Sequence, residues 1–190
     1  YALEVAETVR AAWPADRPLF FRVSAIEGAG GVWGIEDTLA LTRELKARGV
    51  DAIDCSSGGV GGDGPMPGVP RVPGFQAGYS REVRHATGLP TVAVGMISDA
   101  HHAEKLLRDG DADVIALARG LMDDPNWPLH AARTLGYAGA LGLVQEREAQ
   151  RLRLLEQHRA DYPQGSAVAI PYGPQERVPY SWETGIARRG

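Results

Sequence analysis

The sequence predicts an α/β fold with a parallel sheet, and three observations predict it. Four short apolar runs follow one another at intervals of roughly thirty residues, the spacing expected for strands in successive βαβ units. Segments with apolar residues at helical spacing lie between these runs. One more helical segment precedes the first run. The expected order is therefore one helix and then strand and helix, repeated four times.

The first predicted helix covers Ala2 to Trp13, where apolar residues recur at helical spacing, and Pro14 ends it. The strands are expected over 19–25, 50–55, 91–94 and 114–117, and the other helices over 36–48, 79–87, 100–109 and 124–135. Residues 58–74 contain too many Gly and Pro residues for regular structure and predict a long surface loop.

The pattern changes after Gly136, which predicts a division into residues 1–136 and 137–190. Residues 143–160 are helical by composition, but their apolar stripe is thin, so we expect a mostly solvated helix. Residues 161–190 are rich in Pro, Gly and aromatics without a clear period, and they predict an extended tail.

Composition excludes several classes of function. The 190 residues are 44% hydrophobic and 23% charged, which suits a globular domain with a core. A formal net charge of −4 gives no general reason to bind nucleic acid or an anionic membrane. A single cysteine, Cys55, excludes a disulfide framework and multi-cysteine metal sites, and we interpret it as a small core residue in a reducing, cytoplasmic setting. No apolar run is long enough for a membrane span.

Small residues follow the last two predicted strands and indicate an anion site. Gly95 and Met96 come after the third strand, and Ala118 and Arg119 come after the fourth. Backbone N–H groups can approach phosphate oxygens closely where side chains are small, and an arginine adds a planar charged fork. Close packing of helix on strand is the alternative for Gly95 and Ala118, and an ion pair with Asp123 or Asp124 is the alternative for Arg119.

Arg22 is the one charge in the first predicted strand, so it requires an acidic partner or a ligand.

Five stretches resemble the carboxyl-terminal half of Old Yellow Enzyme type flavin oxidoreductases, which are ene-reductases built on a (β/α)₈ barrel that carries FMN. The stretches are LFFRVSA, GVDAIDCSSGG, PGFQ at 73–76, TVAVGMIS and ADVIALARGLMDDPNW. They occur in the right order at compatible spacing within residues 1–135. The resemblance implies that the four strands are strands 5 to 8 of a TIM (β/α)₈ barrel.

The resemblance also implies roles for individual residues. Arg22 would face the pyrimidine edge of the flavin, and the backbone around Gly95, Met96, Ala118 and Arg119 would hold the FMN phosphate. Family members usually have Gly at the position of Ala118. NAD(P)H would be the reductant and an enone, an α,β-unsaturated carbonyl compound, the substrate.

The family's remaining catalytic groups have no match in this sequence. Its His-His or His-Asn pair and its proton-donating tyrosine follow the fourth barrel strand, so we expect them upstream of Tyr1. We therefore expect the chain alone to bind FMN weakly and to show no ene-reductase turnover. A half barrel leaves strand edges uncovered, which predicts association with a complementary half or a second copy.

Two other functions remain open from the sequence. One is a phosphate-binding barrel lyase or isomerase that uses the same strand ends without flavin. The other is a non-catalytic half barrel that acts only by association.

Overall fold

The computed structural model describes residues 1–27, 32–58 and 71–161. The chain divides into two compact units, Tyr1–Val144 and Gln145–Gly190. Most of the predicted loop at 58–74 and nearly all of the predicted tail lie outside the described residues.

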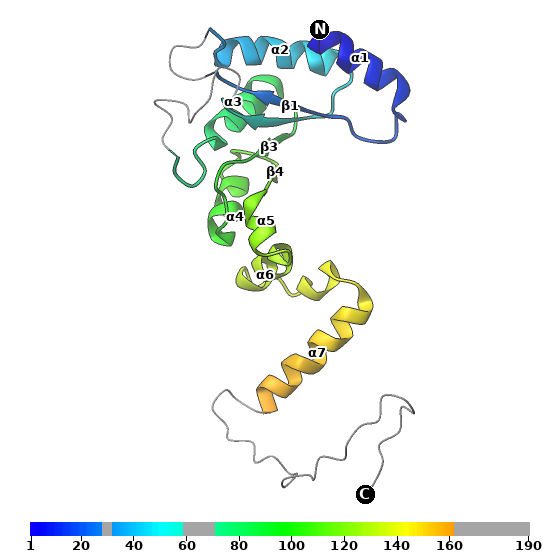
Figure 1. Cartoon of the computed structure of the whole chain (residues 1–190), viewed down its shortest axis with the longest axis vertical. Coiled ribbons are helices and arrows are strands. Elements are labelled where there is room, and N and C mark those ends of the chain that lie inside the picture. The colour runs from blue at the N-terminus through cyan, green and yellow to red at the C-terminus, as the bar shows by residue number, and fades with distance from the viewer. Residues whose placement is uncertain (28–31, 59–70, 162–190) are drawn as a thin grey trace, which may run out of the picture. The chain divides into compact units, whose positions relative to one another are not determined.

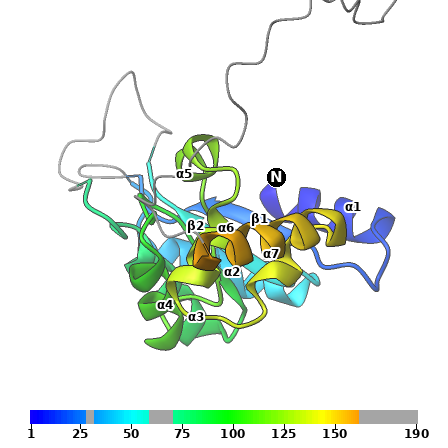
Figure 2. The same ribbon diagram turned by 90° about the horizontal axis from the view of Figure 1, so that it is seen from below.

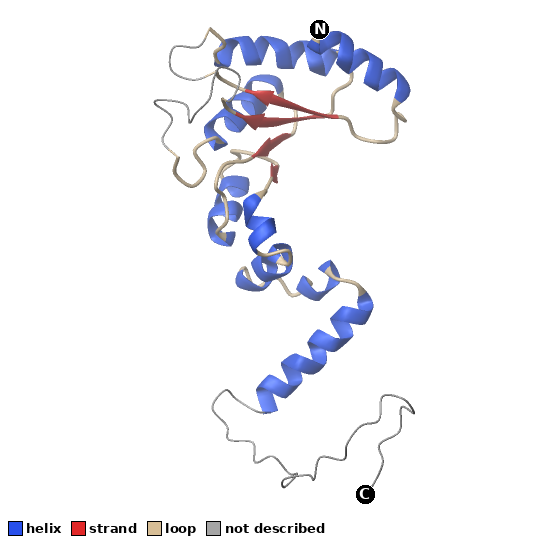
Figure 3. Cartoon of the chain, viewed as in Figure 1, coloured by secondary structure: helices blue, strands red, loops and turns tan. Residues whose placement is uncertain are grey.

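A four-stranded parallel sheet forms the centre of the first unit, as the sequence predicts (Figure 3). Its strands lie in chain order, β1 (Phe20–Ser24), β2 (Ala52–Ser56), β3 (Thr91–Ala93) and β4 (Val114–Ile115), and each pairs with the next in parallel. The register places Arg22 beside Asp54 and Val92 beside Val114. The carboxyl ends of all four strands therefore lie at one edge of the sheet.

Helices connect the strands (Figure 1). In the first unit they are α1 (Ala2–Ala12), α2 (Ile35–Ala47), α3 (Ala77–Thr87), α4 (Ala100–Arg108), α5 (Arg119–Asp123) and α6 (Trp127–Thr134), followed by the 3₁₀ helix η1 (Ala140–Leu143). Local chemistry sets their ends. Gly88 ends α3 with a left-handed φ of 66°, and the Asp99 carboxylate accepts the His102 N–H at 2.7 Å to cap α4.

The structure differs from the prediction at β4, which ends at Ile115 instead of Leu117. The Ala116 N–H still donates to the Ala93 carbonyl at 2.8 Å, and the chain then turns at Ala118 into α5. The sequence did not predict α5, because a single turn of five residues carries no apolar period. Figure 2 shows α5 set apart from α2, α3 and α4.

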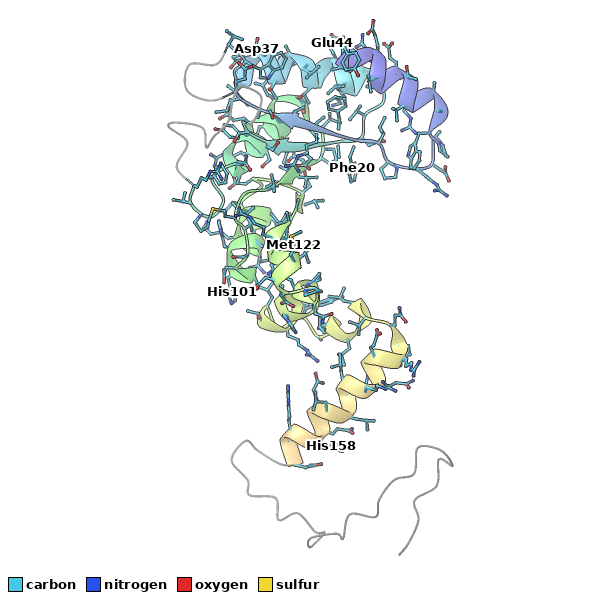
Figure 4. The ribbon with its side chains drawn as sticks, viewed as in Figure 1. Phe20, Asp37, Glu44, His101, Met122 and His158 are labelled. Carbon is cyan, nitrogen blue, oxygen red and sulfur yellow. The ribbon has the colours of Figure 1, made fainter. Side chains whose placement is uncertain are left out.

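Two apolar clusters fill the space between the sheet and its helices. The larger joins β1, β2, α2 and α3 through wholly buried side chains such as Leu45, Ile53 and Val83. The smaller lies under β3 and α4 and consists largely of alanines, together with Ile97 and Leu106. On the opposite face of the sheet Phe20 is 58% exposed, and Figure 4 shows it on the side away from α1 and α2.

The second unit contains α7 (Glu146–Asp161), which confirms the predicted helix with a later start. The Glu148 carboxylate accepts the Gln145 N–H at 3.1 Å just before the helix begins. Its leucines Leu154 and Leu155 are exposed, as expected for a solvated helix. No described helix combines the length and the apolar character needed to cross a membrane.

Candidate functional site

A cavity of about 190 Å³ opens at the carboxyl ends of β3 and β4. Residues 94–98 after β3 and residues 116–120 after β4 line it, and Arg71, Phe75 and Gln76 complete the wall. The structure thus brings Gly95, Met96, Ala118 and Arg119 to one cavity. Their part in phosphate binding stays a prediction. Arg22 is not among the lining residues.

The chain takes an unusual backbone path at the β3 end of this cavity. Gly95 has a φ of 124° and Met96 a φ of 56°, and Met96 is the only non-glycine residue with positive φ among the described residues. A Cβ at Gly95 would lie 3.2 Å from both Gln76 Oε1 and Phe75 Cδ1. Glycine is therefore required at 95 both by its φ and by the close approach of neighbouring side chains.

Both strand ends present backbone donors that the described protein does not use. Within residues 71–161, the N–H groups of Met96, Ile97 and Ser98 after β3 donate to no protein acceptor, and neither do those of residues 118–120 after β4. Backbone donors that lack a protein partner are satisfied by water or by a ligand. Several such donors around one cavity, with an arginine beside them, match the requirements of a phosphate group.

Two hydrogen bonds from distant segments hold the β3 end in place, and a third ties the neighbouring Gln76 to Ser57 after β2. The Gly74 N–H donates to the Gly95 carbonyl at 2.7 Å, and the Gln76 amide donates to Ser57 Oγ at 2.8 Å. The indole N–H of Trp127 donates to the Ser98 carbonyl at 2.7 Å. The turn at 95–98 is thus braced by the segment before α3 and by α6.

Arg119 is exposed and makes no ion pair within the described part of the chain. Asp124, one of the aspartates considered as its partner, instead lies 2.7 Å from His130 Nδ1. Ala118 is also exposed, so its methyl group needs no space inside the protein. Both residues are accessible to a ligand in the cavity.

Arg22 has the acidic partner that its position requires. Its Nη1 lies 2.7 Å from Asp54 Oδ2 on the neighbouring strand, and the guanidinium side chain remains 55% exposed. The other oxygen, Asp54 Oδ1, is buried without a hydrogen-bond partner in the described structure. The carboxylate therefore depends on Arg22 for compensation of its charge. The predicted contact of Arg22 with flavin stays a prediction.

Cys55 is a core residue, as predicted. Its side chain is wholly buried, and burial, assisted by the charge of Asp54, raises the pKa of the thiol to about 12. A thiol with so high a pKa is a poor nucleophile. Among the described residues, no three His, Cys, Asp or Glu side chains are grouped closely enough to hold a metal ion.

Sequence reasoning did not assign Arg71, Phe75, Gln76 or Trp127 to the site. The PGFQ stretch contributed to the resemblance, but its proximity to Gly95 depends on contacts between segments about twenty residues apart. The hydrogen bond from Trp127 to Ser98 could not be predicted from the sequence, because an indole N–H has no characteristic sequence spacing to its acceptor.

The matched family defines the class of protein. The sequence model that describes the NADH:flavin oxidoreductase / NADH oxidase family matches residues 1–136. The chain therefore belongs to this family of FMN-dependent oxidoreductases. This confirms the resemblance to Old Yellow Enzyme type proteins.

Curated relatives are named more specifically as NADPH dehydrogenases. The protein of Halalkalibacterium halodurans is 40% identical over 133 residues, covering 70% of this chain and 38% of the relative. That of Geobacillus sp. (strain WCH70) is 37% identical over 145 residues, covering 76% and 41%. That of Bacillus subtilis is 38% identical over 132 residues, covering 70% and 37%. The chain spans about two fifths of the length of these relatives.

Proposed function

We propose that this chain is the FMN-phosphate-binding part of an NAD(P)H-dependent oxidoreductase that reduces activated alkenes, namely α,β-unsaturated carbonyl compounds. The observation that carries the proposal is the cavity after β3 and β4, where unused backbone donors lie beside Arg119 in a chain of this family. Bound FMN would supply hydride transfer between NAD(P)H and the alkene.

The residues present fit the phosphate end of FMN. The N–H groups at Met96 and Ala118 would offer hydrogen bonds from two adjacent strand ends that line the cavity. Arg119 adds a cation whose donors are not taken by a described carboxylate. A phosphate monoester carries a charge of about −1.5 to −2 near neutral pH, so it would be attracted to this group of donors.

Arg22 is suited to a second task at the flavin ring. Asp54 engages one nitrogen of the guanidinium and orients it, while an arginine has five N–H donors in total. The remaining donors and the positive charge would favour the reduced form of a ring that gains negative charge. Arg22 is therefore proposed to bind the pyrimidine edge of the flavin.

The sheet is proposed to be strands 5 to 8 of a (β/α)₈ barrel. In support, the four parallel strands lie in chain order. Phe20 and Val114 lie on the same face of the sheet, and they are 58% and 48% exposed. Exposed apolar groups on a sheet face favour association. We propose a complementary barrel half or a second copy of the chain as the partner. A cytoplasmic setting fits the free, buried Cys55.

The test is a comparison of FMN with riboflavin, which lacks the phosphate, by titration of the full chain and measurement of flavin fluorescence. We expect FMN to bind weakly but more tightly than riboflavin, and the chain alone to give no enone reduction with NADPH. Equal affinity for the two flavins would contradict the phosphate site. Binding of phosphate with no binding of FMN would favour the flavin-free lyase or isomerase.

A further inference from the structure

Arg71 is the second arginine of the cavity, and the proposed phosphate role does not use it. The lining residues include two guanidinium groups, Arg71 and Arg119, and no carboxylate. Arg71 is exposed and makes no ion pair within the described residues. Two like charges beside one cavity repel each other unless an anion lies between them.

The backbone around Arg71 is held against the cavity. The Gly74 N–H bonds to Gly95, and the Phe75 N–H donates to the Val72 carbonyl at 3.1 Å, which closes a turn directly after Arg71. On its other side, Gly74 has a φ of 78°, and a Cβ there would lie 2.9 Å from His102 on α4. The turn is therefore fitted between Gly95 and α4.

We propose that Arg71 is a second guanidinium ligand of the phosphate group bound in this cavity. Arg71 comes from the segment before α3, whereas Arg119 comes from the segment after β4. The inference rests on the proposed function for the identity of the ligand as FMN, but its chemistry needs only a phosphate dianion. A single phosphate offers several oxygens, so it can accept donors from two arginines and from the backbone at once.

The alternative is that Arg71 is a solvated surface arginine without a ligand. The two interpretations predict different results with phosphate. Removing the charge of Arg71 lowers the phosphate affinity of the chain only if Arg71 binds the phosphate. Arg71→Gln removes the charge and keeps a polar side chain of similar length. Arg43 on α2 is also exposed and free of ion pairs among the described residues, so Arg43→Gln is the matched control.

The experiment titrates inorganic phosphate into the ¹⁵N-labelled full chain at constant ionic strength and follows the Gly95 and Gly120 amide signals by NMR. We expect Arg71→Gln to weaken phosphate binding about fivefold, since an exposed pair contributes up to about that factor. Arg119→Gln should have a similar effect, the double variant a larger one, and Arg43→Gln none. Thermal unfolding of Arg71→Gln should match that of the unchanged chain.

The outcomes separate this inference from the proposed function. If phosphate binds and Arg71→Gln has no effect, Arg71 is not a ligand, while the flavin proposal stands. If Arg71→Gln weakens phosphate binding but FMN binds no better than riboflavin, the Arg71 inference holds and the flavin proposal fails. If neither phosphate nor FMN shifts the amide signals, both are overturned.

Discussion

The β1–β2 region and the β3–β4 region of the sheet are built differently. β1 and β2 pair over five residues and cover a cluster of large side chains that includes Leu39 and Leu45. β3 and β4 pair over only two residues and lie on a cluster dominated by alanines. Large buried side chains contribute most to stability, whereas short strands and small residues leave backbone groups free near the surface.

This difference in construction suggests that one part of the sheet stabilises the fold and the other part provides the predicted phosphate site. The β1–β2 region contains the larger buried apolar cluster, and the β3–β4 region supplies the cavity and the unused backbone donors. Substitutions in the first region should therefore change only the free energy of unfolding, whereas substitutions around the cavity of the second should also change phosphate affinity. Three predictions test this division, and a fourth tests an ion pair that lies beside β4 and outside the cavity.

Leu45→Ala should have the largest effect. Leu45 is wholly buried in the β1–β2 region, so its truncation should lower the free energy of unfolding by about 3 kcal/mol. Urea denaturation measures this loss. The control Leu135→Ala, at a residue 38% exposed, should cost less than about 1 kcal/mol. Similar losses for the two variants would contradict the assignment of the core.

Gly95→Ala should reduce both stability and binding in the β3–β4 region. The required φ of 124° and the 3.2 Å approach to Gln76 and Phe75 should cost about 1–3 kcal/mol of unfolding free energy. Phosphate affinity measured by NMR should fall about tenfold, equivalent to about 1.4 kcal/mol.

Gly142→Ala is the control for Gly95→Ala, since a Cβ there has no atom within 4 Å. It should leave unfolding and phosphate affinity unchanged. Retention of full phosphate affinity by Gly95→Ala would show that the β3 end does not bind the anion.

Trp127→Phe and Trp13→Phe form a matched pair. Each removes one indole hydrogen bond to a backbone carbonyl, that to Ser98 at 2.7 Å and that to Pro18 at 3.2 Å. Each should lower the unfolding free energy by about 1 kcal/mol. Only Trp127→Phe should weaken phosphate binding, by about threefold, because a loosened 95–98 turn misplaces its donors. Equal phosphate affinities for both variants would remove Trp127 from the site.

Asp113→Asn should have the smallest effect, and this effect should disappear at low pH, where the carboxyl group of the unchanged chain is protonated. The hydrogen bond from Arg84 lowers the pKa of Asp113, so its stabilisation is fully present above the ordinary carboxyl pKa and is lost as pH falls through the lowered value. Because the pair is about one-third exposed, the contribution should stay below about 1 kcal/mol.

Urea denaturation of the unchanged chain, Asp113→Asn and Arg84→Gln between about pH 2 and pH 6 tests this linkage. The unchanged chain should lose more stability on acidification than Asp113→Asn, and Arg84→Gln should remove most of the difference. An identical pH dependence in all three proteins would show that the ion pair contributes nothing measurable.

The sequence determined the elements and the chemistry of the strand ends. Apolar periodicity is local, so the four parallel strands and most helices could be predicted, and the small residues at Gly95 and Ala118 indicated where backbone donors would be free. It also determined that Arg22 needs a partner, because a charge in an apolar strand must be compensated.

Only the tertiary structure decided which distant groups meet. Strand register made Asp54 the partner of Arg22, and packing brought Arg71 and Gln76 to the β3 end while Trp127 reached Ser98. These contacts join segments about twenty to thirty residues apart, and no local period encodes such distances. The sequence thus predicted an anion site at two strand ends, whereas tertiary packing decided which side chains line the cavity found there.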